Sequence, residues 1–232
     1  MWEVHLHTAQ GIADAGMRAV IEHMRPGMTE LDVYAELTFA MGRAGGETPG
    51  VPALVAAGEG SASVHSLPSR RVIRSGDIVN VDIFGVYNRY HASLARCFSM
   101  GTPLPAVSAQ IESVVGGAKL AAQFIRPGLP IMDLLNRMEA YYRDQGIWDD
   151  QWWIGGYELG IGFPPDTVGE FYYEVGLDPE EAVFETGMVC NYESNFYLPE
   201  AAGVAVQTNT MAFTERNAAF LSSIPPDLII VD

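Results

Sequence analysis

Basic residues are scarce in this chain, and it has no long apolar run. The 232 residues include only 13 Lys and Arg against 29 Asp and Glu, which gives a net charge of −16. Because 13 basic residues are too few to neutralise a phosphate backbone, we expect no nucleic-acid partner. No stretch approaches the ~18 apolar residues of a spanning helix, so we expect no membrane partner. The first residues do not read as a secretory leader, which makes the cytoplasm the expected location.

Cysteine is nearly absent as well. The two cysteines, Cys97 and Cys190, lie in apolar, strand-like segments where buried free thiols are usual, so we assign them no chemistry. What the chain does have is apolar content: 48% of its residues are hydrophobic, enough to bury a full core. We expect a single domain over residues 1–232, without a separate amino-terminal domain.

Two parts of the sequence repeat one another. Residues 24–28 (MRPGM) are echoed by residues 125–129 (IRPGL), an offset of 126 − 25 = 101. Residues 76–82 (GDIVNVD) are echoed by residues 187–193 (GMVCNYE), an offset of 187 − 76 = 111. Each half therefore predicts two helices separated by Arg-Pro-Gly, then strands, the last of which carries one carboxylate.

Hydrophobic periodicity, with Gly and Pro as breaks, predicts the elements of each half. Thr29 is a candidate N-cap for the second helix, and Asp32 follows three residues later, where an acid favours a helix start. The expected helices are 8–24, 29–41, 106–125 and 131–145, and the expected strands lie near 53–57, 61–65, 78–84, 89–98, 156–163, 188–196, 204–214 and 228–231.

Asp82 and Glu193 occupy equivalent places in the two halves, which suggests a shared site. Asp82 alone would be explained equally well as a turn-capping acid before Gly85, but an acid in a β-branched strand is costly unless it is paired or bound. Two carboxylates brought together without a cation raise the pKa of one of them, which produces an acid able to exchange protons near neutrality.

Five segments of the chain are specific when taken together: 64–68 (VHSLP), 82–85 (DIFG), 89–96 (RYHASLAR), 160–162 (GIG) and 187–193. In these segments, which extend along essentially its whole length, the chain resembles the pita-bread fold family of methionine aminopeptidase, aminopeptidase P, prolidase, creatinase and ectoine hydrolase. This resemblance implies an α+β fold with two pseudo-symmetric halves around a curved antiparallel sheet.

Peptidases of that family hold two metal ions on five side chains, and the resemblance places only two of the five here, Asp82 and Glu193. The second Asp is expected eleven positions after the first, at 82 + 11 = 93, where the chain has Ser93. Leu159 stands in place of the metal-binding His, and Gln207 in place of the last Glu. Neutral and apolar side chains cannot offset about four positive charges, so we expect no dinuclear centre and no cofactor.

Within the family that this chain resembles, creatinase and ectoine hydrolase are the members that cleave C–N bonds in small charged molecules without a metal ion. The resemblance implies that this chain acts similarly. His65 matches the family's catalytic histidine and would serve as general base and then general acid. Glu193 and Asp82 would complete the catalytic set by holding a cationic substrate or stabilising developing charge. The expected substrate contacts are His91, Arg96, Tyr157, Glu158 and Gln207.

Each of these residues also has a purely structural explanation. His65 would then be a loop-end histidine bonded to the backbone, and His91 a partly buried histidine without a role in substrate binding. Tyr157 and Glu158 would be loop surface. The aromatic group of Trp148, Trp152 and Trp153 is more typical of a core lid or a dimer contact than of a binding site.

Two other functions stay open. The missing metal ligands also suit an inactive pita-bread domain that binds a peptide or protein. A third possibility is an Xaa-Pro-type metallopeptidase with a depleted metal site, holding one ion weakly on Asp82 and Glu193. A small-molecule substrate and a homodimer are the expected partners, and a partner subunit would be able to close the pocket.

Overall fold

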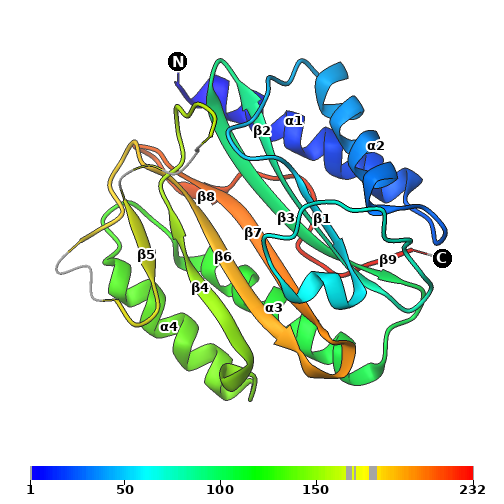
Figure 1. The fold of residues 1–232 in the computed structure, drawn as a ribbon. Helices are drawn as coiled ribbons and strands as arrows, with labels where there is room; N and C mark the ends of the chain where they lie inside the picture. The colour runs from blue at the N-terminus through cyan, green and yellow to red at the C-terminus, as the bar shows by residue number, and fades with distance from the viewer. Residues whose placement is uncertain (1, 166–168, 170, 178–181, 232) are drawn as a thin grey trace.

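The computed structural model describes residues 2–165, 169, 171–177 and 182–231. Within these residues the strands form one sheet in the order β1-β2-β3-β7-β6-β4-β5, with β8 beside β7 and β9 beside β3 (Figure 1). All pairings are antiparallel except that of β3 with β9. The strands are β1 (Leu54–Ala57), β2 (Ile78–Tyr87), β3 (Tyr90–Met100), β4 (Gln151–Tyr157), β5 (Tyr172–Glu174), β6 (Val189–Leu198), β7 (Gly203–Phe213), β8 (Ala218–Phe220) and β9 (Ile229–Val231).

The four α-helices that the structure describes cover one face of this sheet (Figure 1). α1 (Trp2–His23) and α2 (Glu30–Arg43) lie behind the first half, where α1 contacts β2 and β3. α3 (Pro105–Phe124) and α4 (Ile131–Asp144) lie behind the second half, where α3 contacts β6 and β7. Because the helices share one face, the opposite face is left to loops and to any site.

The internal repeat corresponds to two similar halves. β1, β2 and β3 form one half of the sheet, β7, β6 and β4 form the other, and the halves join where β3 pairs with β7. Each half has its own large apolar cluster between its helix pair and its strands. The expected α+β architecture of two halves around an antiparallel sheet is confirmed.

Local signals placed most elements correctly. Thr29 caps α2 as expected: its hydroxyl accepts from the Asp32 amide, and the Asp32 carboxylate accepts from the Thr29 amide at 2.7 Å. α1 begins at Trp2 rather than near residue 8. The expected strand at 61–65 is wrong, because a 3₁₀ turn, η1 (Gly58–Ala62), starts at Gly58 with φ 52°. The strand expected at 156–163 is observed as β4, which runs earlier in the chain and ends at Tyr157. β5 and β8 were not predicted.

Gly85 allows α1 to lie directly on the sheet. A Cβ at this position would come within 1.9 Å of the Ala9 carbonyl oxygen and 2.6 Å of the Ala13 nitrogen, both backbone atoms of α1. Because neither can yield without moving the helix, glycine is required here for packing.

We expect Gly85→Ala to lower the free energy of unfolding by at least about 2 kcal/mol, because the added methyl separates α1 from β2. Gly11→Ala is the matched control: Gly11 is exposed on α1 with open space around its Cβ, so alanine should stabilise by about 0.5–1 kcal/mol. Urea denaturation of the two variants measures both changes. Equal effects would show that Gly85 is not a packing position.

Candidate active site

Asp82 and Glu193 lie on one cross-strand row of the sheet. Asp82 is opposite Ala95, Ala95 is opposite Thr208, and Thr208 is opposite Glu193. Cross-strand partners point to the same face, so both acids point away from the helices. Three strand spacings separate them, roughly 14 Å between Cα atoms in a flat sheet, and only the small Ala95 and Thr208 lie between. The repeated segments thus deliver their acids to one site.

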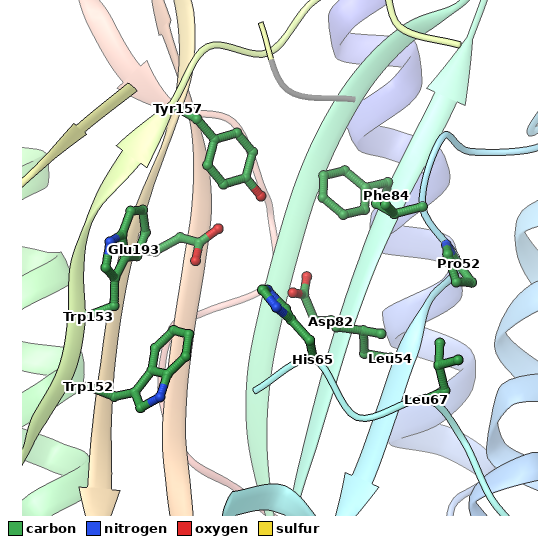
Figure 2. Close-up of a pocket in the computed structure, with 11 residues that line it drawn as sticks. Pro52, Leu54, His65, Leu67, Asp82, Phe84, Trp152, Trp153, Tyr157 and Glu193 are labelled. Carbon is green, nitrogen blue, oxygen red and sulfur yellow. The ribbon is translucent and has the colours of Figure 1, made fainter. Parts of the chain in front are cut away.

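The two acids line a cavity of about 530 Å³ on the face opposite the α-helices (Figure 2). His65 and Tyr157 are its other polar lining residues. The remaining lining is apolar and consists of Val51, Pro52, Leu54, Leu67, Phe84, Trp152 and Trp153.

Burial in this apolar cavity sets the proton affinity of both acids. Burial raises the pKa of Glu193 from 4.5 to about 7, and hydrogen bonds from Tyr157, Asn195 and Asn191 oppose that rise. Burial, followed by the charge of Glu193, raises the pKa of Asp82 well above its usual value. Like charges in a desolvated site disfavour double ionisation, so the pair retains at least one proton at neutral pH.

A polar group on β4 and β6 fixes the Glu193 carboxyl. Asn191 Nδ2 donates to Glu193 Oε1 at 2.5 Å, and Asn195 Nδ2 donates to Oε2 at 3.4 Å. Asn191 Oδ1 in turn accepts from the Tyr157 amide at 2.7 Å. Figure 2 shows the Tyr157 hydroxyl directed into the cavity, where it bonds Glu193. Glu193 is therefore positioned by three neighbours.

Asp82 is less constrained. Its Oδ1 is buried and accepts no hydrogen bond from any residue that the structure describes. A buried oxygen without a donor is costly, so this atom is available to a ligand.

His65 lies at the mouth of the cavity, on the exposed segment that follows η1. Its imidazole stands edge-on to Trp152, with ring centroids 6.2 Å apart, and is directed into the cavity on the Asp82 side (Figure 2). The geometry brings His65, Asp82 and Glu193 together; their catalytic roles stay a prediction.

Trp152 and Trp153 form a cavity wall that sequence reasoning did not assign. β4 pairs with β6 so that Gly155 is opposite Glu193, which puts Trp153 and Tyr157 on the same face as that acid. A register shift between Gln151 and Trp153 lets both tryptophans border the cavity. The alternation of side chains along β4 could have placed Trp153 on the cavity face from the sequence alone. The register shift that brings Trp152 to the cavity leaves no pattern in the sequence.

Arg96 does not line the cavity, contrary to its expected contact with substrate. Its neighbour Ala95 shares a row with Asp82, so Arg96 points to the helix face. There its guanidinium, 1% exposed, donates to five oxygens at 2.7–3.0 Å, four of them backbone carbonyls. Arg96 therefore ties β3 to β7 and to the 224–225 segment.

His91, Glu158 and Gln207 are also absent from the lining. His91 is buried, its Nδ1 lies 2.9 Å from the Arg89 carbonyl, and its Nε2 accepts from the Gly50 amide at 3.2 Å. Gln207 is buried, and with its amide oriented to donate to the Pro226 carbonyl it accepts from Arg96 at 3.0 Å. Of the five expected substrate contacts, only Tyr157 reaches the cavity.

The side chains present do not fit a pair of metal ions. Ser93 and Leu159 are buried and offer no anionic ligand, and Gln207 is held at Arg96. Among the described residues, no three His, Cys, Asp or Glu side chains gather as a metal-binding group. Two carboxylates alone are too few for a site of that kind.

Comparison with known proteins places this site in a family. The sequence profile of metallopeptidase family M24 matches residues 4–215. The chain belongs to this family. Proteins similar to this chain include an uncharacterized peptidase, YqhT, of Bacillus subtilis (28% identity, 97% of this chain, 62% of that protein) and an Xaa-Pro dipeptidase of Pyrococcus furiosus (28%, 94% and 60%).

The solved structures agree on the fold. Dipeptidase PepE from Mycobacterium ulcerans matches with a TM-score of 0.88 at 26% identity, over 99% of this chain and 60% of that one. Prolidase from Pyrococcus furiosus matches with a TM-score of 0.86 at 26% identity, over 96% and 64%. The pita-bread fold of the M24 chain is thereby confirmed. It spans about three fifths of the length of these relatives, and none of its described helices is long and apolar enough to cross a bilayer.

We expect Glu193→Gln to remove a pH-dependent loss of stability. Below pH 4.5 the Glu193 carboxyl is protonated in both the folded and the unfolded state. Between pH 4.5 and 7 it loses its proton in the unfolded state but keeps it in the folded state, so the free energy of unfolding falls as pH rises. The loss amounts to about 3 kcal/mol by pH 8. In urea denaturation, the free energy of unfolding of Glu193→Gln should therefore exceed that of the unsubstituted protein at pH 8 and differ little from it at pH 4.5.

The exposed turn residue Glu215 provides the control, because Glu215→Gln should keep the native pH dependence. If Glu193→Gln loses stability between pH 4.5 and 8 as steeply as the native protein, burial of Glu193 is not what sets its proton affinity.

Proposed function

We propose that this M24 chain hydrolyses a C–N bond in a small molecule bound in the cavity, with an acid pair and a histidine acting in place of a dinuclear metal centre. The observation that carries the proposal is the convergence of Asp82, Glu193 and His65 on one apolar cavity. Membership of a peptidase family supports C–N hydrolysis, and the neutral side chains at Ser93 and Leu159 support a route without two metal ions.

The proton transfers can be written with these three residues. His65 accepts a proton from water as its oxygen attacks the carbon of the scissile bond. The protonated member of the Asp82–Glu193 pair donates to the leaving nitrogen as the C–N bond breaks, and the other member stabilises the charge that develops. Proton exchange with solvent then restores both groups. Trp152, Trp153 and Phe84 exclude bulk water around the bond.

A second candidate is a peptidase of Xaa-Pro type that uses one ion on Asp82 and Glu193. The names of several relatives favour it: the Pyrococcus furiosus protein is an Xaa-Pro dipeptidase. Two ligands hold a first-row ion weakly, so this activity would depend on added metal.

The test measures turnover of amidines, guanidino acids and Xaa-Pro dipeptides by the full chain, before and after EDTA, with metal content read by mass spectrometry. We expect turnover that resists EDTA and fewer than ~0.2 ions per chain. Turnover abolished by EDTA and restored by Mn²⁺, Co²⁺ or Zn²⁺ would favour the second candidate. No turnover of any compound would favour the binding module and contradict both hydrolases.

His65→Ala should lower kcat by about 100-fold or more, because general acid–base catalysis by one side chain contributes about that much. Its melting temperature should stay unchanged, since His65 is exposed. His7→Ala is the control: His7 is exposed on α1 and is not among the described residues that line the cavity. Steady-state kinetics and thermal melting of both variants decide the matter, and near-native kcat in His65→Ala would remove this residue from the mechanism.

A further inference from the structure

The charge in the cavity has one sign. Asp82 and Glu193 are its acids, and no Lys or Arg side chain is among its described lining residues. Arg96, the only Lys or Arg within the described strands, points to the opposite face and donates its hydrogen bonds mainly to backbone carbonyls. The chain's single lysine, Lys119, is on α3 and pairs with Asp227 at 2.6 Å. Apart from the His65 imidazole, which is cationic only when protonated, no described lining residue can neutralise a bound anion.

The walls suit an apolar body. Trp152, Trp153, Phe84 and Tyr157 surround the acids, and aromatic faces attract organic cations that approach within about 6 Å of the ring. Leu54 and the other aliphatic residues complete the lining. A hydrated inorganic ion would lose water against these walls without gaining enough ligands, whereas an organic cation presents its apolar part to them.

The cavity contains a hydrogen-bond acceptor for such a cation. Asp82 Oδ1 is buried without a hydrogen-bond donor from the described residues, whereas Glu193 is held by Asn191 and Asn195. An N–H group of a ligand placed between the two acids would supply the donor that Asp82 lacks, and a charged donor makes the stronger bond. The free oxygen, the single sign of charge and the aromatic walls all favour the same ligand chemistry.

We propose that the cavity selects a small organic monocation, an amidinium or alkylammonium on an aromatic or aliphatic body, with no carboxylate close to the charged nitrogen. This inference rests on the proposed function, because it names the substrate class of the same cavity. The cationic nitrogen lies between Asp82 and Glu193, and the apolar body contacts Trp152 and Phe84. A dipeptide zwitterion fits poorly, since its carboxylate would meet no Lys or Arg among the described lining residues.

Isothermal titration of the full chain at pH 7 with three probes of the same shape tests this class. Benzamidine is cationic, benzamide neutral and benzoate anionic, and EDTA in every titration prevents a metal ion from attracting benzoate. We expect benzamidine to bind at least ten-fold more tightly than benzamide and benzoate to bind more weakly than either. Benzamide or benzoate binding as tightly as benzamidine would overturn the proposal, as would no benzamidine binding up to about 10 mM.

Variants locate the selectivity. Asp82→Asn and Glu193→Gln keep the shape of each side chain and remove its charge, so each should reduce the benzamidine preference over benzamide by about ten-fold or more. Glu215→Gln, an exposed acid outside the cavity, should keep the full preference. An unchanged preference in both cavity variants would show that benzamidine binds elsewhere and would contradict the proposal.

Binding of these probes requires no turnover, so the two proposals fail separately. Benzamidine selectivity in a protein that hydrolyses nothing would reject the hydrolase and keep the cation site. Hydrolysis of carboxylate-bearing substrates without benzamidine selectivity would reject the cation site and keep the hydrolase.

Discussion

The burial of Asp82 and Glu193 on one row of the sheet is the constraint on which the rest of the site depends. Each half of the chain supplies one acid from the same place in its repeat, and the β3–β7 pairing fixes the distance between them. Because the sheet is covered by helices on one face only, the acids meet in an apolar cavity on the other. Desolvation then raises the pKa of both groups, so the pair retains at least one proton at neutral pH.

The positive charge of the sheet is kept apart from these acids. Ala95 lies in the cross-strand row that joins Asp82 to Glu193, and Arg96 is the next residue on β3. Because side chains alternate along a strand, Arg96 points to the helix face, where it donates to five oxygens. It cannot neutralise the pair from there, and burial lowers its own pKa to about 10, so it stays charged. The described cavity lining therefore has acids but no Lys or Arg, while Arg96 secures the strand that carries the row.

How much of this was predictable depends on whether the information was local. The repeat predicted both halves and the equivalent placement of Asp82 and Glu193, because a duplicated pattern of Gly turn and strand implies a duplicated position. Strand alternation would have directed Arg96 away from Asp82, given a hairpin turn at Asn88 and Arg89. The Trp152 wall depends on a register shift in β4, and the covering of His91 by the Gly50 backbone depends on a long loop. Neither leaves a pattern in the residues themselves.

The substitutions at the family's metal positions are consistent with the electrostatics of such a site. Four carboxylates in one apolar cavity without metal ions would repel one another strongly, and each additional acid would have to be neutralised by a proton. With Ser93 and Gln207 in place of two carboxylate ligands, the acids of the cavity are reduced to a pair that one proton can largely balance. Asn191 and Asn195 then supply hydrogen bonds to Glu193 where a cation would otherwise stabilise its charge. The loss of metal ligands and the retention of Asp82 and Glu193 thus agree with the proposed hydrolase, in which protons alone balance the charge of the pair.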